Sequence, residues 1–277
     1  MARGRLGRRA FLSVATIGSI AALGSWLEVR GHPAASGDGL EAQAGAVPLG
    51  AGGAAPSQGT HPVVSAVDLV RSAPDGMIAA LPGHRGLLAL TVDDGTSAEV
   101  VSAYADFARR SGIRLTFFPN GNNPSWTDNA AQLRPLVDSG QVQLGNHTWS
   151  HPNLTRLSDY DVADQISRNE KFLTNTYGVS GRPFLRPPFG FHNERTDRIA
   201  ADQGYTTEVM WNGSLSDSSV LSSDEILGFA RRWLTAERIV IGHANHPGII
   251  GALDQIGALI QSRGLRTVTL NDVFLHA

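Results

Sequence analysis

The sequence of 277 residues contains no cysteine. This absence excludes disulfide bridges, thiolate zinc sites, cysteine nucleophiles and lipoprotein anchors. Any metal ion must therefore be held by His, Asp or Glu. An excess of basic charge is also missing, because 23 Lys and Arg are balanced by 25 Asp and Glu, and the net charge is -2. The sequence thus gives no sign of nucleic-acid binding and suits an uncharged substrate.

The chain begins with a basic head and an apolar run at residues 10–27. Arg8 and Arg9 stand just before Phe11 and Leu12, which resembles a twin-arginine export signal. Several serine and threonine residues interrupt the apolar run, so it is weak as a permanent membrane span. We therefore expect export to the cell envelope or the extracellular space, with a signal anchor as the alternative.

The composition divides the chain into three parts. Residues 1–31 are expected to be the export signal or the anchor. Residues 32–62 are dominated by Gly, Ala, Pro and Ser without an apolar period, which predicts a flexible linker. Residues 63–277 are expected to form a single folded domain.

From residue 87 onward, short apolar runs alternate with amphipathic stretches of helical period. This alternation predicts parallel strands, because a parallel return needs a crossover. We count seven such units, which suits either an open doubly wound α/β sheet or a closed α/β barrel. The predicted strands are 87–92, 114–118, 142–146, 183–186, 205–210, 238–242 and 265–269, and the predicted helices include 97–111, 158–177, 222–234 and 249–262.

Polar and aromatic residues follow the predicted strands at their carboxyl ends, where α/β sheets and barrels place their sites. In a barrel these ends converge on one mouth, whereas in an open sheet the first and last lie far apart. A shared site therefore favours the barrel. The residues are Asp93, Asp94, Asn120, His147, Arg186, Trp211, Asn212 and His243.

Two of these strand ends carry the residue types of a metal site. Asp93 and Asp94 end an apolar strand, where adjacent carboxylates repel each other unless a cation compensates; a polar turn is the alternative. His147 and His151 are four residues apart, a spacing that puts both imidazoles on one face of a helical turn. Two His and one carboxylate leave a position open for water, as in catalytic zinc sites. The second carboxylate is then free to act as general base.

Arg186 and His243 supply the remaining candidate groups. Arg186 is the natural partner of the spare aspartate, and the two prolines after it predict an extended backbone that aims the N–H of Phe189 into the site. His243 is a core residue, a further ligand or a proton donor; with two histidines on the metal, a general acid is the missing role. Two further histidines on these loops have no evident partner and are not expected to take part: His192 and His246.

Aromatic residues also lie on the same side of the predicted sheet. Sugars stack their apolar faces on such rings, although aromatics at strand ends are equally often ordinary packing. These residues are Trp149, Phe189, Phe191 and Trp211.

Taken together, these residues resemble the polysaccharide deacetylase family, which is carbohydrate esterase family 4 or the NodB homology domain. The resemblance covers residues 87–277 and rests on five motifs in family order. Four are kept: Thr-Val-Asp-Asp-Gly at 91–95, His-Thr-Trp-Ser-His-Pro at 147–152, Arg-Pro-Pro-Phe-Gly at 186–190 and Ile-Gly-His at 241–243. The fourth family motif, Asp-x-x-Asp-Trp, is degraded to Ser-Leu-Ser-Asp-Ser at 214–218, which loses its first aspartate and its tryptophan.

The resemblance implies a distorted (β/α)7 barrel, with residues 63–277 as the catalytic domain. It implies a hydrolase that removes N-acetyl groups from polysaccharide containing N-acetylglucosamine, such as peptidoglycan or chitin. It further implies that Asp94, His147 and His151 bind zinc, cobalt or another divalent ion. The partner is then a polysaccharide, and a membrane is involved only through an N-terminal anchor.

The resemblance also assigns roles to the other residues. Asp93 is the general base and Arg186 orients it. His243 is the general acid, and Asp217 matches the aspartate that tunes it. The N–H of Phe189 stabilises the oxyanion. The substrate is lined by the rings of Trp211 and Phe189 and by Ile241, which replaces the family leucine.

Two other functions remain open at this point. The same site could release O-acetyl groups from xylan or wall glycan, because either carbonyl can be attacked. The chain could also be a non-catalytic carbohydrate-binding protein, given the degraded fourth motif. The intact set of acid, base, orienting and ligand residues speaks against this second alternative: Asp93, Asp94, His147, His151, Arg186 and His243.

Overall fold

The computed structural model describes residues 71–83 and 86–275. The predictions for residues 1–31 and 32–62, the export signal or anchor and the linker, lie outside the described residues and stay predictions. None of the described helices has the length and hydropathy needed to cross a membrane.

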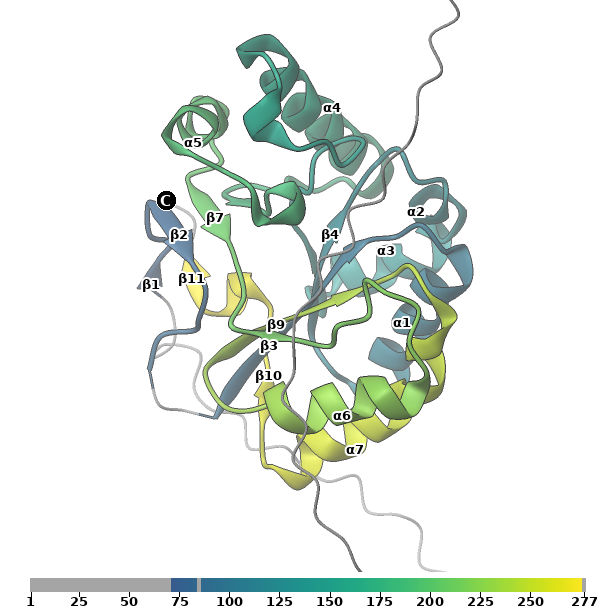
Figure 1. The fold of residues 1–277 in the computed structure, drawn as a ribbon. Helices are drawn as coiled ribbons and strands as arrows, with labels where there is room; N and C mark the ends of the chain where they lie inside the picture. The colour runs from purple at the N-terminus through teal and green to yellow at the C-terminus, as the bar shows by residue number, and fades with distance from the viewer. Residues whose placement is uncertain (1–70, 84–85, 276–277) are drawn as a thin grey trace, which may run out of the picture. The chain divides into compact units, whose positions relative to one another are not determined.

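Strand β3 (Leu87–Asp94) is the centre of the largest sheet and is buried along its whole length. Such a continuous burial suits a parallel strand that is covered on both faces. On one side of β3 lie β4 (Leu115–Pro119) and β5 (Val142–Leu144), and on the other lie β9 (Arg238–His243) and β8 (Gly213–Ser214). All of these pairings are parallel (Figure 1).

A second parallel sheet brings the two edges of the first together. It has the order β2 (Gly76–Ile78), β7 (Thr207–Val209) and β6 (Phe184–Leu185). A parallel bridge from Asn146 to Leu185 joins the end of β5 to β6, and three residues connect β7 to β8. The strands therefore run around a ring, and the predicted (β/α)7 barrel is confirmed.

The distortion of the barrel comes from its last predicted strand, β10 (Arg266–Thr267). Leu88 of β3 pairs with Arg238 of β9 and also with Thr267 of β10. Since β9 occupies one edge of β3, β10 lies on the same edge as β4, beside the first residues of the strand. A separate two-stranded sheet pairs β1 (Arg71–Ser72) with β11 (Phe274–Leu275).

The predicted helices are present with small changes at their ends. They are α1 (Ala98–Ser111), α4 (Asp159–Tyr177), α6 (Ser223–Trp233) and α7 (Leu253–Ser262). The first three begin after serine caps, whose hydroxyls accept from backbone N–H groups, as the sequence pattern indicates. Before α7, the backbone of Pro247–Ala252 is a 3-10 helix and not the start of the helix. Three further helices lie outside the ranges that were named from the sequence: α2 (Ser125–Asp128), α3 (Ala130–Asp138) and α5 (Glu194–Ala201).

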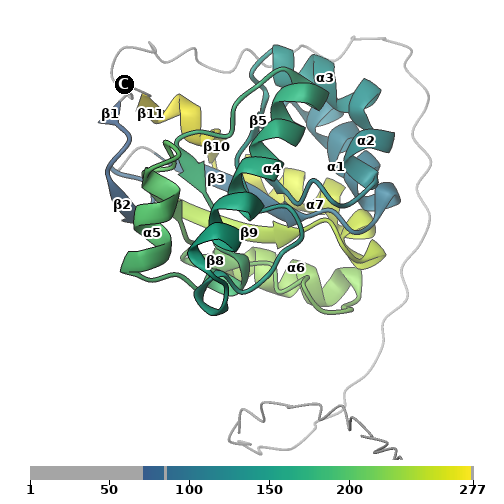
Figure 2. The same ribbon diagram turned by 90° about the horizontal axis from the view of Figure 1, so that it is seen from above.

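The alternation of side chains along β3 positions the site. Leu88, Leu90 and Val92 belong to the apolar cluster shared with α1, α6 and α7, and Figure 2 shows α1 and α7 on one side of this strand. Leu87 and Ala89 belong to a second apolar cluster on the opposite face. Because successive strand residues alternate, Thr91 and Asp93 continue that second face toward the carboxyl end of the strand. The interior of the barrel is thus apolar at one end and polar at the other.

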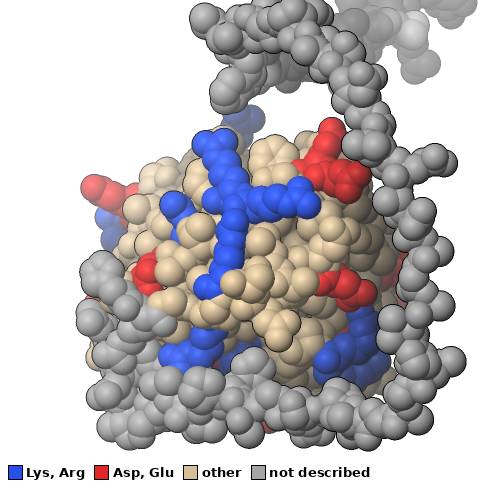
Figure 3. Space-filling view, turned by 90° about the horizontal axis from the view of Figure 1, so that it is seen from below, with Lys and Arg blue, Asp and Glu red and all other residues tan. Residues whose placement is uncertain are grey.

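The outer surface around α6 and α7 carries separated charges (Figure 3). Basic residues lie in the last turn of α6, Arg231 and Arg232, while Asp224 and Glu225 lie in its first turn. Acidic side chains at the N-terminus and basic side chains at the C-terminus of a helix oppose its dipole. This charge pattern therefore stabilises α6.

Candidate functional site

Asp93 and Asp94 end β3 at a sharp backbone turn. Asp94 has a φ of 68° and Gly95 a φ of 87°. The carbonyl oxygen of Asp94 accepts hydrogen bonds from Trp126 Nε1 at 2.7 Å and from Asn123 Nδ2 at 3.0 Å. A Cβ at Gly95 would lie 2.3 Å from the Trp126 indole, so the position requires glycine. A left-handed aspartate that is fixed from several sides is typical of a functional site.

His147 and His151 do not share a helical turn, so that prediction was wrong. Thr148 has a φ of 70° and His151 a φ of 60°, whereas a helix needs negative φ at both positions. Asn120 Nδ2 donates to the carbonyl of His147 at 2.6 Å and fixes the irregular backbone. The two imidazoles nevertheless lie together, with ring centroids 4.8 Å apart.

Asp94, His147 and His151 form the group of described residues whose ligand atoms could hold a metal ion. Asp94 Oδ1 lies 3.3 Å from His147 Nε2 and 3.4 Å from His151 Nε2. Two ligands bound about 2.0–2.1 Å from a zinc ion at a tetrahedral angle are separated by about the same distance. Asp94 Oδ1 is also buried and has no hydrogen-bond partner among the described residues. An acceptor of this kind needs a cation or a donor, so the group fits a divalent ion.

The tautomer of His147 is set by the backbone of Arg186. His147 Nδ1 lies 2.6 Å from the carbonyl oxygen of Arg186, which can only accept, so Nδ1 carries the proton. Nε2 then presents its lone pair toward Asp94. An imidazole oriented in this way is the usual form of a metal-binding histidine.

The charges within the group suit cation binding. Burial favours the neutral acid at Asp94, but the neighbouring His147 and His151 and the hydrogen bond from Asn245 hold its pKa well below the usual range. Burial and the neighbouring His147 lower the pKa of His151 to about 4, so its imidazole is neutral near pH 7. His147 is buried, yet Asp93 and Asp94 raise its pKa. A divalent cation at this position would compete with a proton for His147 Nε2.

Asn245, which the sequence analysis missed, holds the other oxygen of Asp94. Asn245 Nδ2 donates to Asp94 Oδ2 at 2.7 Å. Its own Oδ1 accepts from the backbone N–H of Thr96 at 3.1 Å, which fixes the orientation of the amide. Oδ2 is thereby satisfied while Oδ1 faces the histidines. Its place two residues after His243, at the end of β9, was the available signal.

Replacing Asn245 with alanine is therefore expected to weaken zinc binding by about 10- to 100-fold, the usual effect of removing a partner of a ligand. Titration calorimetry on the metal-free protein measures this directly. The matched control is Asn122→Ala, an exposed asparagine on a neighbouring loop, which should leave the affinity unchanged. An Asn245→Ala affinity within twofold of the parent would show that the amide does not position Asp94.

Asp93 is paired with Arg186 in the interior of the barrel. Arg186 Nη1 lies 2.7 Å from Asp93 Oδ1, and the arginine is fully buried. The guanidinium also donates to Thr91 Oγ1 at 2.8 Å and to the Val209 carbonyl at 2.9 Å. Burial lowers the pKa of Arg186, and the charge of Asp93 opposes this effect. The second oxygen, Asp93 Oδ2, lies 3.6 Å from His147 Nε2 and so faces the metal group.

His243 is adjacent to Asp93 on the neighbouring strand and is paired with Asp217. The register of β3 and β9 places Asp93 opposite His243. Asp217 Oδ1 lies 3.0 Å from His243 Nδ1, and Asp217 Oδ2 accepts from the His243 backbone N–H at 3.1 Å. Burial disfavours the charged imidazole, but Asp217 and Asp93 outweigh it and raise the pKa of His243. Asp217 is the aspartate that the degraded motif retains, and it pairs with His243.

The turn at Phe189 differs from the extended backbone that the two prolines predicted. Only Pro187 is extended; the chain turns through Pro188–Gly190, and Phe189 has a φ of 59°. The reason is that the ring of proline fixes only its own φ, which is compatible with a turn as well as with an extended chain. Among the backbone hydrogen bonds of the described residues, none uses the N–H of Phe189. Phe189 is 59% exposed, and its ring lies 4.4 Å from the ring of His151, measured between centroids.

The remaining predicted positions are two proposed substrate contacts and the two histidines that were not expected to take part. Ile241 is buried on the face of β9 that carries His243, and it is outside both apolar clusters. Trp211 is partly buried and packs against the second apolar cluster near Arg186. His192 does have a partner, Asp197 at 3.0 Å, contrary to expectation. Neither His192 nor His246 belongs to the metal group.

An α/β barrel with an Asp-His-His group, a buried carboxylate and a paired histidine at one mouth is the architecture of a hydrolase site. The family model described as polysaccharide deacetylase matches residues 81–207. By this match and by the relatives below, the chain is similar to the polysaccharide deacetylase family.

Individual relatives agree with this assignment. The chain is 29% identical over 197 residues to a peptidoglycan-N-acetylglucosamine deacetylase of Bacillus cereus, covering 70% of each protein. The crystal structure of a peptidoglycan N-acetylglucosamine deacetylase is similar at 27% identity with a TM-score of 0.65, over 73% of this chain and 94% of that one. A family 4 carbohydrate esterase from Streptomyces lividans, solved with acetate, is 26% identical with a TM-score of 0.60, over 69% of this chain and 95% of that one.

Proposed function

We propose that this protein is a metal-dependent hydrolase that removes N-acetyl groups from polysaccharide containing N-acetylglucosamine. The observation that carries the proposal is the unsatisfied Asp94 Oδ1 between two imidazoles, with the Asp93–Arg186 and His243–Asp217 pairs on either side. A ligand set, a base and an acid are thereby within one site. The N-acetylglucosamine deacetylases among the relatives support the choice of substrate class.

Asp93 is the proposed general base. A divalent ion held by Asp94, His147 and His151 supplies Lewis acidity, which lowers the pKa of water and polarises an acetyl carbonyl. Asp93 Oδ2 faces the metal group and is positioned to take the proton from the attacking water. Arg186 fixes the other carboxylate oxygen, so the base cannot rotate away.

His243 is the proposed general acid, which delivers a proton to the leaving amine. Asp217 accepts at Nδ1, so the proton on Nε2 is the one available for transfer. The free N–H of Phe189 is the proposed donor to the oxyanion. The exposed ring of Phe189 and the side chains of Trp211 and Ile241 are proposed to contact the substrate.

The pH dependence of the reaction should report the His243–Asp217 pair. His243 must be protonated to act as acid, so kcat/KM is expected to fall as pH rises through its raised pKa. Asp217→Asn removes the charge that raises this pKa, so the alkaline limb should move to lower pH. A pH profile of acetate release measures the shift. An unmoved alkaline limb in Asp217→Asn would exclude His243 as the group that titrates there.

The function itself is tested by acetate release from chitooligosaccharide, peptidoglycan and acetylxylan in the presence of zinc or cobalt. We expect release from the N-acetylated substrates. Release from acetylxylan alone would favour an O-acetyl esterase. Binding of these glycans without any acetate would instead favour the non-catalytic reading that the degraded motif at Ser214 and Ser218 suggests.

A further inference from the structure

A groove of about 400 Å³ lies directly beside the proposed catalytic site. This volume lies within the range of roughly 300–1,000 Å³ found for small-molecule sites. One wall is formed by residues 153–156, which come just after the metal ligand His151 in the sequence. The other is formed by residues 190–192, which come just after Phe189. The groove is lined by Asn153, Thr155, Arg156, Gly190, Phe191 and His192.

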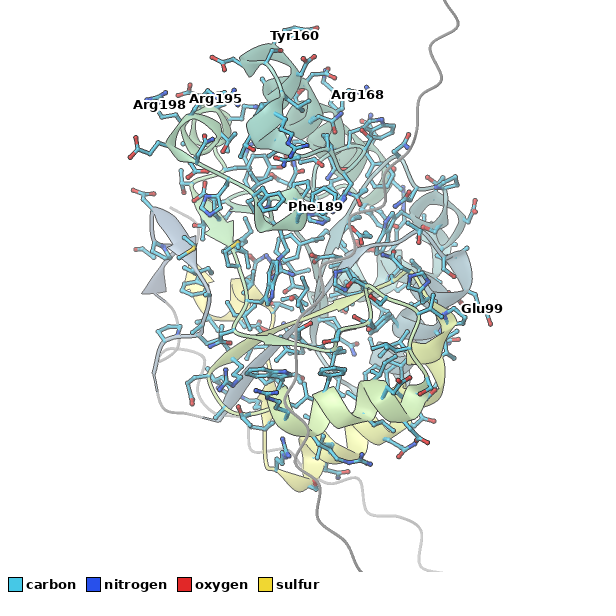
Figure 4. The ribbon with its side chains drawn as sticks, in the orientation of Figure 1. Glu99, Tyr160, Arg168, Phe189, Arg195 and Arg198 are labelled. Carbon is cyan, nitrogen blue, oxygen red and sulfur yellow. The ribbon has the colours of Figure 1, made fainter. Side chains whose placement is uncertain are left out.

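Both walls of the groove are held by ion pairs on the neighbouring helix α5. Arg195 pairs with Asp159 at 2.7 Å and donates to the Thr155 carbonyl at 3.4 Å, which supports the first wall. His192 pairs with Asp197, which supports the second. Figure 4 shows Arg195 on α5, above Phe189 in the view. Asp159 and Asp197, the acidic partners in these two contacts, are therefore already paired.

Arg156 is the one arginine that lines the groove, and it is exposed. Among the described residues, its guanidinium has no carboxylate, carbonyl or aromatic partner. Beside it, Asn153 Oδ1 accepts from Thr155 N and Oγ1, so the amide nitrogen of Asn153 is available as a donor. Phe191 is 53% exposed and its ring lies 6.1 Å from that of Phe189 between centroids.

We propose that this groove binds a sugar residue that carries a carboxylate, next to the N-acetylated residue in the catalytic site. The Arg156 guanidinium forms two hydrogen bonds to the carboxylate, Asn153 donates to a hydroxyl group, and the ring of Phe191 packs on the apolar face of the sugar. This subsite rests on the proposed function and gives the enzyme a preference for an acidic glycan over a neutral one.

The chemistry of the lining favours a carboxylate. The planar fork of a guanidinium matches the two oxygens of a carboxylate, and a single cation balances its single charge. A neutral sugar offers Arg156 hydroxyl oxygens as acceptors, but no charge to pair with the guanidinium. The exposed aromatic ring beside the cation adds contact area for a pyranose and none for a small free anion.

The test compares one substrate in two charge states. The probe is a peptide-free oligosaccharide of alternating N-acetylglucosamine and N-acetylmuramic acid, with its lactyl carboxylates free or converted to methyl esters. The full chain, loaded with zinc, should show a kcat/KM about tenfold higher for the free acid, the size expected for an exposed charge-assisted pair. Raised salt should reduce this preference.

Arg156→Gln should remove the preference, and Arg156→Lys should keep part of it. Arg231→Gln, an exposed arginine on α6, is the control and should keep the parent ratio. Equal rates on the two forms by the parent enzyme, or a parent-like preference in Arg156→Gln, would overturn the subsite while leaving deacetylation intact. Absence of acetate from both forms would instead overturn the proposed function and the subsite with it.

Discussion

Replacing Asp93 with asparagine is expected to lower kcat for acetate release by roughly 10²- to 10⁴-fold, the usual contribution of a general base. The amide oxygen can still accept from Arg186 Nη1, which lies 2.7 Å from Asp93 Oδ1 in the parent protein. It cannot take a proton from water. Because Asp93 is not in the ligand group, zinc should remain bound at one ion per chain.

The test must separate a loss of catalytic rate from a loss of stability. Arg186 is fully buried, and Asp93→Asn removes its counter-charge. Breaking a buried pair costs up to about 3–5 kcal/mol, so thermal unfolding and zinc content are measured on the same sample as the rate. Asp138→Asn, at an exposed aspartate at the end of α3, is the control and should change none of the three. A folded, zinc-loaded Asp93→Asn protein with a rate close to the parent would exclude Asp93 as the base.

Replacing His151 with alanine is expected to remove both zinc and activity. The side chain supplies one of the three proposed ligands, and Nε2 has Asp94 Oδ1, 3.4 Å away, as its polar neighbour among the described residues. Losing a ligand should weaken zinc binding by at least about 100-fold, more than the loss of a ligand's partner. The imidazole is partly exposed, at 27% of its side-chain surface, so the fold should tolerate the change.

Thermal unfolding with and without zinc measures this effect independently of turnover. Ligand at a concentration 100 times its Kd stabilises a folded protein by about 2.7 kcal/mol, so zinc should raise the melting temperature of the parent. It should not raise that of His151→Ala. His246→Ala, outside the ligand group, should respond as the parent does. Equal zinc-induced stabilisation in all three proteins would place the metal elsewhere.

The elements that the sequence predicted are those with a clear periodic signal. Strand β3 is a continuous apolar run that ends in two aspartates, and α4 has nineteen residues with a serine cap. The unpredicted elements are short or locally ambiguous: β8 has two residues, and α3 contains Pro135. The closure of the barrel follows from long-range pairing that no local pattern contains.

In the candidate site, too, the contacts between distant residues could not be predicted from local sequence. The ligand types could be read from their positions at strand ends. The left-handed conformation at Thr148 and His151 could not. The carbonyls of His147 and Thr148 are held by Asn120, from another strand end, and spacing does not reveal this contact. Asn245 reaches Asp94 across 151 residues of sequence and Thr91 reaches Arg186 across 95, and spacing alone does not predict such partners.

Metal removal and restoration tests the central claim most directly. The metal is first removed from the protein with a chelator, and its zinc content is measured. Acetate release from N-acetylated oligosaccharide is then followed as zinc is added back. The account predicts that activity is lost with the metal and returns in proportion to zinc bound, up to one ion per chain. Full acetate release by the metal-free protein would contradict it.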